Sequence, residues 1–281
     1  MNKPSTISII VTTYNWPAAL DRVLASIALQ SDRNFEVVVA DDGSGPETRA
    51  LIERFSESVS FPVRHFWQED DGFRVARCRN GAVARAEGDY IIFIDGDCCL
   101  FPDFVRAHRG MAEAGAFVTG RRAFIKRRFT DFILSGNRDC FRWPRWVWFL
   151  LGLFGQSNRP FQFISLPQTK ARVWKLVDQW EKAQTCNLGV WRSDLMKVGG
   201  FDESYHGHGL EDSDFILRLL RSGIRRKNMA FNSPVLHLFH GRPSTMAQQP
   251  TPDGISNRDR FARLLADETR THAIESMLAR D

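Results

Sequence analysis

Three kinds of pattern are missing from this sequence of 281 residues. Its five cysteines include no C-x-x-C pair and no metal-finger spacing, which excludes a zinc finger and is typical of a protein with reduced thiols. No apolar run reaches the roughly 20 residues that a helix needs to cross a bilayer. The start, MNKPSTISIIVTTYN, has the pattern of neither a signal peptide nor a membrane anchor. We therefore expect a cytoplasmic protein.

The composition is that of a folded globular protein. Hydrophobic residues make up 43% of the chain, charged residues 25% and aromatic residues 12%, and there is no repeat or low-complexity tract. These values exclude the disordered and fibrous classes. The length suits one large α/β domain, or one domain with an appendage.

The formal net charge is +5, and the basic residues are concentrated in one region. Such clusters attract phosphates, whether of a nucleotide, a nucleic acid or an anionic lipid, and a merely solvated basic face is the alternative. The cluster consists of Arg121, Arg122, Lys126, Arg127, Arg128, Arg138, Arg142 and Arg145.

Residues 143–155 form an apolar stretch within this basic region, WPRWVWFLLGLFG. The stretch is too short to span a bilayer as a helix. It could lie in the membrane interface, with its tryptophans at the level of the headgroups. It could equally form a buried helix or the wall of an acceptor site, and the sequence leaves these alternatives open.

Short apolar runs alternate with helical patterns along the first hundred residues. This alternation predicts an α/β fold with a mostly parallel sheet flanked by helices, whose ligands bind beyond the carboxyl ends of the strands. Two acidic turns, Asp41-Asp42 and Asp95-Gly96-Asp97, lie at that edge. We expect strands at 7–13, 35–40, 63–67 and 90–94, and helices at about 19–30, 47–56 and 75–87.

The remainder of the chain is less regular. Residues 121–185 show no clear period, and we interpret them as an Arg/Trp-rich insertion or lid in a domain that spans residues 1–242. Ser193 is expected to cap a short helix, and a helix with an acidic first turn follows within 207–223. Residues 243–281 are expected to form a flexible connection and a C-terminal helix.

The acidic turn at residues 95–97 has the chemistry of a metal site. Side chains two apart on an extended strand point the same way, so Asp95 and Asp97 can converge on one ligand, and Gly96 allows a close backbone approach. Paired carboxylates are stabilised by a positive partner. A divalent cation that also binds substrate phosphates is such a partner.

Two histidines near the end of the expected domain offer further ligands. His237 and His240 lie three apart after an apolar run in PVLHLFHGRP. They are close enough to share a metal ion. Histidines that merely bind backbone groups are the structural alternative.

Taken in order, these motifs resemble family two glycosyltransferases of the GT-A fold. The likeness rests on VTTYN, DDGS, EDDGFRVARCRNGAVARAEGDYIIFIDGD, CNLGVWRSDLMKVGGFDE and GHGLEDSDF. It runs from about Ile7 to His240, apart from the insertion, and the later portion is similar to the C-terminal motif of galactosyltransferases and chondroitin polymerases. The resemblance implies a Rossmann-like nucleotide-diphospho-sugar transferase fold and the transfer of a hexose from a UDP-sugar.

The resemblance also implies roles for individual residues on the donor side. Asp97, His237 and His240 would hold one Mn²⁺ or Mg²⁺, although one of the two C-terminal ligands in relatives is a methionine. Independently of the resemblance, Arg121 and Arg122, which follow Gly120 in the insertion, could contact the donor. The nucleotide of the donor would be bound by Thr12, Thr13, Tyr14, Asn15, Asp41, Asp42, Arg79, Asn80, Asp95 and Gly96.

On the acceptor side, the pair Glu211-Asp212 matches the acidic motif that supplies the catalytic base. Asp212 would take the proton of the acceptor hydroxyl from about 2.6–3.2 Å, and Glu211 would hold a sugar. A single displacement would invert the anomeric centre. The aromatic residue that precedes this motif in relatives is replaced here by His206 and His208, which we expect to contact the acceptor. The structural alternative is that acidic residues merely favour a helix N-terminus.

Our leading interpretation is an inverting, metal-dependent hexosyltransferase that donates galactose, N-acetylgalactosamine or glucose. It would extend a cell-surface polysaccharide, a lipopolysaccharide or a lipid-linked glycan at the inner face of the cytoplasmic membrane. Residues 243–254 could close over the donor as a lid.

Two alternatives remain open. A nucleotidyltransferase acting on sugar phosphates would share the sheet and the metal, but it usually carries a glycine-rich basic loop where this chain has TTYNWPAA. A basic binder of nucleic acid or membrane surfaces would use the clustered Arg, Trp and Phe. No nucleic-acid recognition pattern is present, and the acidic turns would repel a polyanion.

Overall fold

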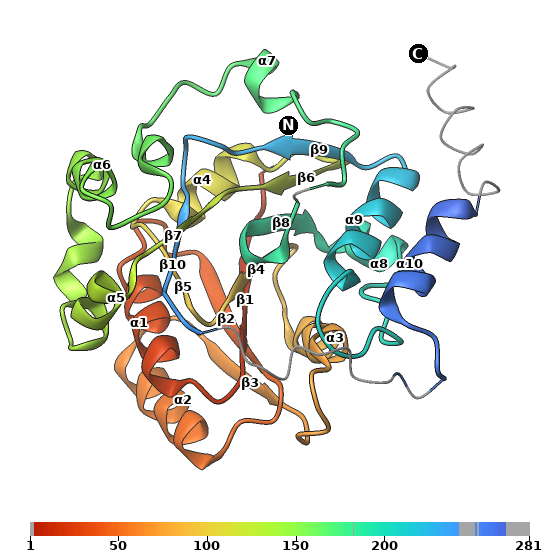
Figure 1. The fold of residues 1–281 in the computed structure, drawn as a ribbon, viewed down its shortest axis with the longest axis horizontal. Coiled ribbons are helices and arrows are strands. Elements are labelled where there is room, and N and C mark those ends of the chain that lie inside the picture. Colours follow the sequence, from red (N-terminus) through yellow and green to blue (C-terminus); the bar gives the residue numbers. More distant parts are fainter. Residues whose placement is uncertain (1–2, 182, 242–250, 252, 268–281) are drawn as a thin grey trace.

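The structure is a computed structural model, and it describes residues 3–181, 183–241, 251 and 253–267. Within these residues a seven-stranded sheet has the strand order β3-β2-β1-β4-β8-β6-β9 (Figure 1). The first four strands in this order run parallel, and β8 runs antiparallel to both of its neighbours. The strands are β1 (Ile7–Thr13), β2 (Phe35–Asp41), β3 (Val63–Trp67), β4 (Tyr90–Asp95), β6 (Ala116–Thr119), β8 (Leu188–Trp191) and β9 (Arg225–Asn228). The predicted α/β fold with a mostly parallel sheet is confirmed.

Helices cover both faces of this sheet because its central strands are apolar on both sides. Ile9 of β1 packs in the cluster that includes α1 and α2, whereas Ile10 packs with α3 and α9. Figure 1 shows α1 and α2 on one side of the sheet and α3, α8 and α9 on the other. The helices are α1 (Pro17–Ala28), α2 (Pro46–Ser58), α3 (Val75–Arg85), α4 (Phe104–Met111), α8 (Arg192–Lys197), α9 (Glu211–Arg221) and α10 (Asn257–Ala266).

A second, three-stranded sheet joins distant parts of the chain. It has the order β5-β10-β7, formed by Cys98–Cys99, Val235–His237 and Arg122–Phe124. His237 is the register partner of both Cys98 and Phe124. This small sheet therefore places the late histidine beside the acidic turn that follows β4.

The Arg/Trp-rich region contributes to the main core. Its aromatic side chains Phe141, Trp148 and Phe163 are buried, and the Trp148 and Phe163 rings lie 5.8 and 6.1 Å from that of Phe101. Among the described helices, none is long and apolar enough to cross a membrane. The region's helical segments are α5 (Arg127–Leu134), η1 (Arg138–Arg142), α6 (Arg145–Leu153), η2 (Pro160–Phe163), α7 (Lys170–Val173) and η3 (Thr185–Asn187).

Some local expectations differ from the structure. Ser193 lies inside α8 rather than capping it, because the helix already begins at Arg192. By contrast, the helix with an acidic first turn expected within 207–223 is confirmed: α9 begins at Glu211, after Leu210 with a left-handed φ of 75°. Most of the connection expected at 243–254, with its lid role, lies outside the described residues, as does the chain beyond residue 267.

Candidate active site

The carboxyl ends of β1, β2 and β4 meet at one edge of the large sheet. Thr12 is the register partner of Asp95, and Thr13 is the partner of Asp41. The Gly96 N–H donates to the Thr12 carbonyl over 2.6 Å. A Cβ atom at residue 96 would lie 2.8 Å from the same oxygen, so the turn after β4 has no room for a side chain. Thr12 of the VTTYN motif and Gly96 of the acidic turn after β4 are thus in direct contact.

A carboxylate and two imidazoles gather beside this edge. Asp97 Oδ2 lies 3.4 Å from His237 Nε2 and 3.2 Å from His240 Nε2. The three ligand atoms lie within 4.8 Å of one another. His240 Nδ1 lies 3.0 Å from the Gly241 carbonyl, which can only accept. In the neutral ring that donates from Nδ1, Nε2 carries the lone pair that a metal binds, whereas the protonated ring also donates from Nε2 to Asp97.

These three residues fit a divalent metal ion. Burial lowers the pKa of His237 and so favours the neutral imidazole that a metal requires. Burial alone would raise the pKa of Asp97, but the hydrogen bond from His240 and the nearby histidine charges bring it below its usual value. His237 Nδ1 is buried without a hydrogen-bond partner. A carboxylate with two imidazoles favours Mn²⁺ over Mg²⁺, which prefers oxygen ligands alone.

On the other side of Asp95, one buried guanidinium faces three carboxylates. Arg79 Nη1 lies 2.9 Å from Asp212 Oδ1 and 3.4 Å from Glu211 Oε1, and its Nη2 lies 3.7 Å from Asp95 Oδ1. Arg79 is 4% exposed and stays charged because these acids outweigh its burial. The arginine therefore links the end of β4 to the start of α9.

The carboxylates around Arg79 differ in their readiness to ionise. Burial, followed by the charge of Asp212, raises the pKa of Glu211 to about 7. Burial, followed by the charge of Asp97, raises the pKa of Asp95 to about 6. Glu211 Oε2 and Arg79 Nε are buried without a partner. Buried polar atoms of this kind point to a ligand that completes their hydrogen bonds.

Thr185, which the sequence analysis did not single out, holds the predicted base in place. Its Oγ1 donates to Asp212 Oδ1 over 2.7 Å, and its N–H donates to Asp212 Oδ2 over 3.1 Å. Both carboxylate oxygens are thus fixed, one of them also by Arg79. The only signal was position, because Thr185 directly precedes the CNLG motif.

The acidic turn after β2 is bonded mainly within the protein. Asp41 accepts from the Ser44 N–H over 2.8 Å and lies 3.1 Å from His65 Nε2. Asp42 accepts from Gln68 Nε2 and from the Arg74 N–H, and burial raises its pKa to about 6. Their predicted contacts with uracil and ribose stay predictions.

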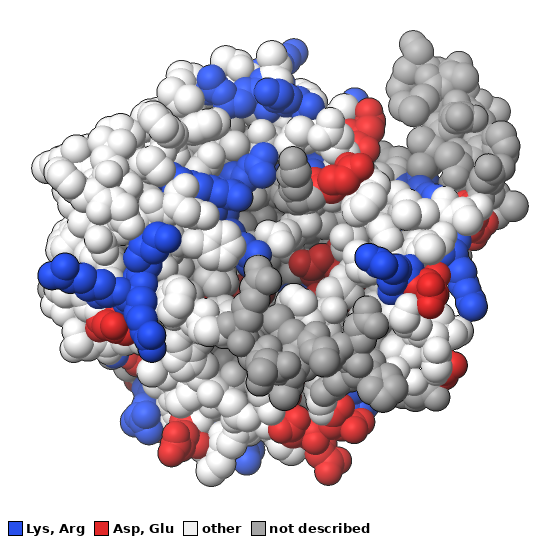
Figure 2. All heavy atoms as spheres, viewed as in Figure 1, with Lys and Arg blue, Asp and Glu red and all other residues white. Residues whose placement is uncertain are grey.

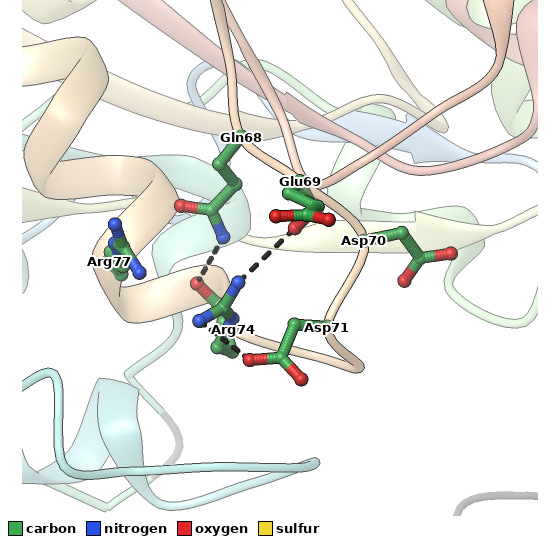
Figure 3. A pocket seen from close by; sticks show the side chains of 6 residues that line it. All are labelled: Gln68, Glu69, Asp70, Asp71, Arg74 and Arg77. Atoms are coloured by element: carbon green, nitrogen blue, oxygen red, sulfur yellow. Dashed lines mark hydrogen bonds and ion pairs between the residues drawn. The ribbon is translucent and has the colours of Figure 1, made fainter.

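A recess opens beside Asp42. It has a volume of about 400 Å³ and is formed by the segment between β3 and α3 (Figure 3). Tyr14, after β1, donates to Asp70 in the same segment over 2.9 Å, and Asn15 Oδ1 accepts from the Gly45 N–H. The recess is lined by Gln68, Glu69, Asp70, Asp71, Arg74 and Arg77.

Other predicted site residues have structural contacts of their own. The Asn80 amide binds the Phe201 backbone through both its oxygen and its nitrogen, so α3 is tied to the loop before α9. His208 is exposed, with its ring 5.7 Å from that of Phe73. The His206 carbonyl accepts from Asn257 at the start of α10. These contacts lie at or beside the loop that precedes α9, and the ligand contacts predicted for the three residues stay predictions.

The basic pair at the start of β7 is half-buried. The Arg122 guanidinium lies 4.7 Å from the Phe124 ring. Its positive charge offsets a part of the rise in the pKa of Asp95 that burial and Asp97 cause. Burial, followed by the charge of Arg159, lowers the pKa of Arg121. Arg122 is thus the member of the pair that acts electrostatically on the acidic turn.

Solved structures share this architecture. S. aureus TarS 1–349 in complex with UDP-GlcNAc has a TM-score of 0.64 and 15% identity, and the match covers 97% of this chain and 71% of that one. Mannosyltransferase PcManGT from Pyrobaculum calidifontis, in complex with GDP-Man and Mn²⁺, has a TM-score of 0.58 and 16% identity, covering 100% and 76%. At these identities the likeness concerns the fold, and it confirms the GT-A architecture.

Sequence relatives and family models point the same way. Validoxylamine A glucosyltransferase of Streptomyces hygroscopicus subsp. jinggangensis is 31% identical over 271 residues, covering 92% of this chain and 60% of that protein. Hyaluronan synthase of Pasteurella multocida is 28% identical, covering 77% and 23%. The chain thus spans less than two thirds of the length of these relatives. Residues 167–241 match the N-terminal domain of galactosyltransferase, and residues 8–166 match the model of glycosyl transferase family 2, to which this chain belongs.

Proposed function

We propose that the chain is an inverting glycosyltransferase that moves a hexose from a UDP-sugar to a hydroxyl of a glycan or lipid-linked saccharide. The observation that carries this proposal is the edge of the sheet where Asp97 and two histidines stand beside Asp95, and Arg79 joins Asp95 to Asp212. Asp95 and Arg79 thus lie between the proposed cation site and the proposed carboxylate base. Such an arrangement would hold the leaving diphosphate on one side of Asp95 and the acceptor hydroxyl on the other.

The donor side is proposed to take a UDP-sugar, as TarS does, with glucose, galactose or N-acetylgalactosamine as the transferred sugar. Asp97, His237 and His240 would hold Mn²⁺, which would neutralise the leaving diphosphate. Thr12, Thr13, Asn15 and Gly96 would meet the nucleotide with backbone and short side chains.

On the acceptor side, Asp212 is proposed as the general base. A base must present an oxygen in a fixed direction, and Thr185 and Arg79 fix both oxygens of Asp212. Asp212 would take the hydroxyl proton as the hydroxyl oxygen bonds to the anomeric carbon. The bond to the diphosphate breaks on the opposite side, which inverts the centre. His206 and His208 would contact the acceptor sugar.

The pathway is proposed to be synthesis of a cell-surface polysaccharide or lipopolysaccharide at the cytoplasmic face of the membrane. The similarity to hyaluronan synthase supports a glycan acceptor. No observation favours a nucleotidyltransferase or a nucleic-acid binder over this function.

Calorimetric titration tests the donor site. Four UDP-sugars (glucose, galactose and their N-acetylamino forms) are titrated into the protein with and without Mn²⁺. We expect one of them to bind only with Mn²⁺. Asp97→Ala should lose this binding, whereas Asp212→Asn should keep it and lose transfer. Glu57→Gln, an exposed change on α2, serves as the matched control. Equal loss of binding in both site variants would refute these roles.

A further inference from the structure

The described surface carries an apolar area that the proposed chemistry does not use. It lies on α6 and η2, where the exposed fractions of Trp146, Phe154 and Phe161 are 64%, 79% and 61%. Leu150, Leu153 and Ile164 are also exposed there. Figure 2 shows no charged side chain over most of α6. Clustered aromatic and aliphatic side chains of this kind mark an interaction site.

These side chains are held outward by a rigid base. On the other side of α6, Trp148 is buried, and both carboxylate oxygens of Asp103 accept from Arg145 over 2.7 Å. Gly152 approaches Pro160 so closely that a Cβ atom would lie 2.7 Å from the proline ring. The apolar area is therefore a built surface of the fold.

A basic group borders the apolar area. Lys126, Arg127 and Arg128 are exposed at the start of α5, and none of them forms an ion pair within the described part of the chain. The Lys126 N–H donates to the Gln156 carbonyl just after α6, so the two areas adjoin. Figure 2 shows the blue side chains over α5 next to the white area over α6.

We infer that α6, η2 and the start of α5 form a docking face for an anionic lipid bilayer. Apolar side chains would enter the interface while Lys and Arg bind the lipid phosphates, as interfacial helices do. Over residues 126–159 the sequence has seven Lys and Arg against two Asp, which suits a negative surface. A two-fold contact between copies would instead bring the basic groups of both copies together.

The docking face is bonded directly to the candidate active site. The Ile125 N–H donates to the His237 carbonyl over 2.9 Å, and the Phe239 N–H donates to Thr130 Oγ1 over 2.9 Å. These two bonds tie the chain before α5, and α5 itself, to the histidine segment. This inference rests on the proposed function in one respect, since it makes the acceptor a lipid-linked saccharide presented at the bilayer surface.

Sedimentation with vesicles tests the inference. The full chain is mixed with vesicles of phosphatidylcholine alone or with 30% phosphatidylglycerol, and the bound fraction is measured. We expect binding to the anionic vesicles that falls as salt rises. Lys126→Gln/Arg127→Gln/Arg128→Gln should weaken it about 100-fold, since each basic residue near the surface contributes about fivefold. Trp146→Ser/Phe154→Ser should weaken it about tenfold or more.

Met196→Ser is the matched control, because Met196 is 61% exposed on α8, away from this face, and should leave binding unchanged. Wild-type protein that stays in the supernatant would overturn the inference. Vesicle binding by the Trp146→Ser/Phe154→Ser variant equal to that of wild type would also overturn it. So would a variant that loses dimerisation but still binds vesicles, or wild-type protein that binds single-stranded DNA but not vesicles. Asp97→Ala should still bind vesicles, so failure of the donor site is distinguishable from failure of the docking face.

Discussion

The glutamate at the start of α9 should reduce the stability of the protein at neutral pH. Glu211 has only 7% of its surface exposed, and burial followed by the charge of Asp212 raises its pKa from 4.5 to about 7. A carboxyl group whose pKa is raised on folding binds its proton more tightly in the folded chain than in the unfolded chain. Replacing it with glutamine keeps the shape and removes the ionisation.

The size of the effect follows from linkage. Below pH 4.5 the Glu211 carboxyl is protonated in both the folded and the unfolded chain, so its ionisation does not reduce the free energy of unfolding. Between pH 4.5 and about 7 the unfolded chain loses the proton first, so stability falls with rising pH. At about 1.36 kcal/mol for each tenfold difference in proton affinity, the penalty above pH 7 reaches about 3 kcal/mol. Glu211→Gln should therefore raise the free energy of unfolding by up to that amount at pH 8.

Urea unfolding at pH 4.5 and pH 8 measures this difference. The gain of Glu211→Gln over wild type should appear at pH 8 and vanish at pH 4.5, while Glu57→Gln should stay within about 0.5 kcal/mol of wild type at both. Transfer activity should fall about 10- to 100-fold, because the sugar that Glu211 is proposed to hold would then bond to a neutral amide instead of a carboxylate. The same stability difference at both pH values would refute this reasoning, and a stabler variant with full activity would remove Glu211 from the site.

Three further predictions concern neighbouring residues. Thr185→Val should lower kcat/KM about 10- to 100-fold by freeing Asp212, and Thr185→Ser should restore it; equal activity of the two variants would exclude the positioning role. Arg79→Met should reduce the free energy of unfolding by about 3–5 kcal/mol at pH 8 and by less at pH 5, where Glu211 is protonated; a loss independent of pH in urea unfolding would contradict this. Gly96→Ala should lower Mn²⁺-dependent UDP-sugar affinity in titration, because the new Cβ atom meets the Thr12 carbonyl; unchanged affinity would show that the turn can yield.

Much of the large sheet could be predicted from the sequence because its strands are buried on both faces, which requires nearly continuous apolar runs. β1, β2 and β4 are short β-branched runs, and burial on both faces demands such runs. Their shared direction places Thr12 beside Asp95, as the structure shows. The strands β5, β7 and β10 have only two or three residues. Runs of that length show no period, so the second sheet could not be seen in the sequence.

The partners of the base were beyond sequence analysis for a different reason. Thr185 and Asp212 lie 27 residues apart, and Arg79 and Asp212 lie 133 apart. No local pattern encodes a hydrogen bond across such separations. α6 shows a similar limit, because Trp146 and Trp148 look alike in the sequence while one is 64% exposed and the other 1%. Packing separates the two tryptophans, because the Trp148 ring lies against those of Phe101, Phe129 and Phe163.

The two aspartates at the end of β4 contact different partners. Asp97 faces the histidines, whereas Asp95 faces Arg79, and the charge of Asp97 raises the pKa of Asp95 while that of Arg79 lowers it. Any added positive charge beside Asp97 would therefore favour ionised Asp95 and tighten its pairing with Arg79. The same guanidinium holds Asp212. The proposed cation site at Asp97 is thus linked to the proposed base Asp212 through two residues, Asp95 and Arg79.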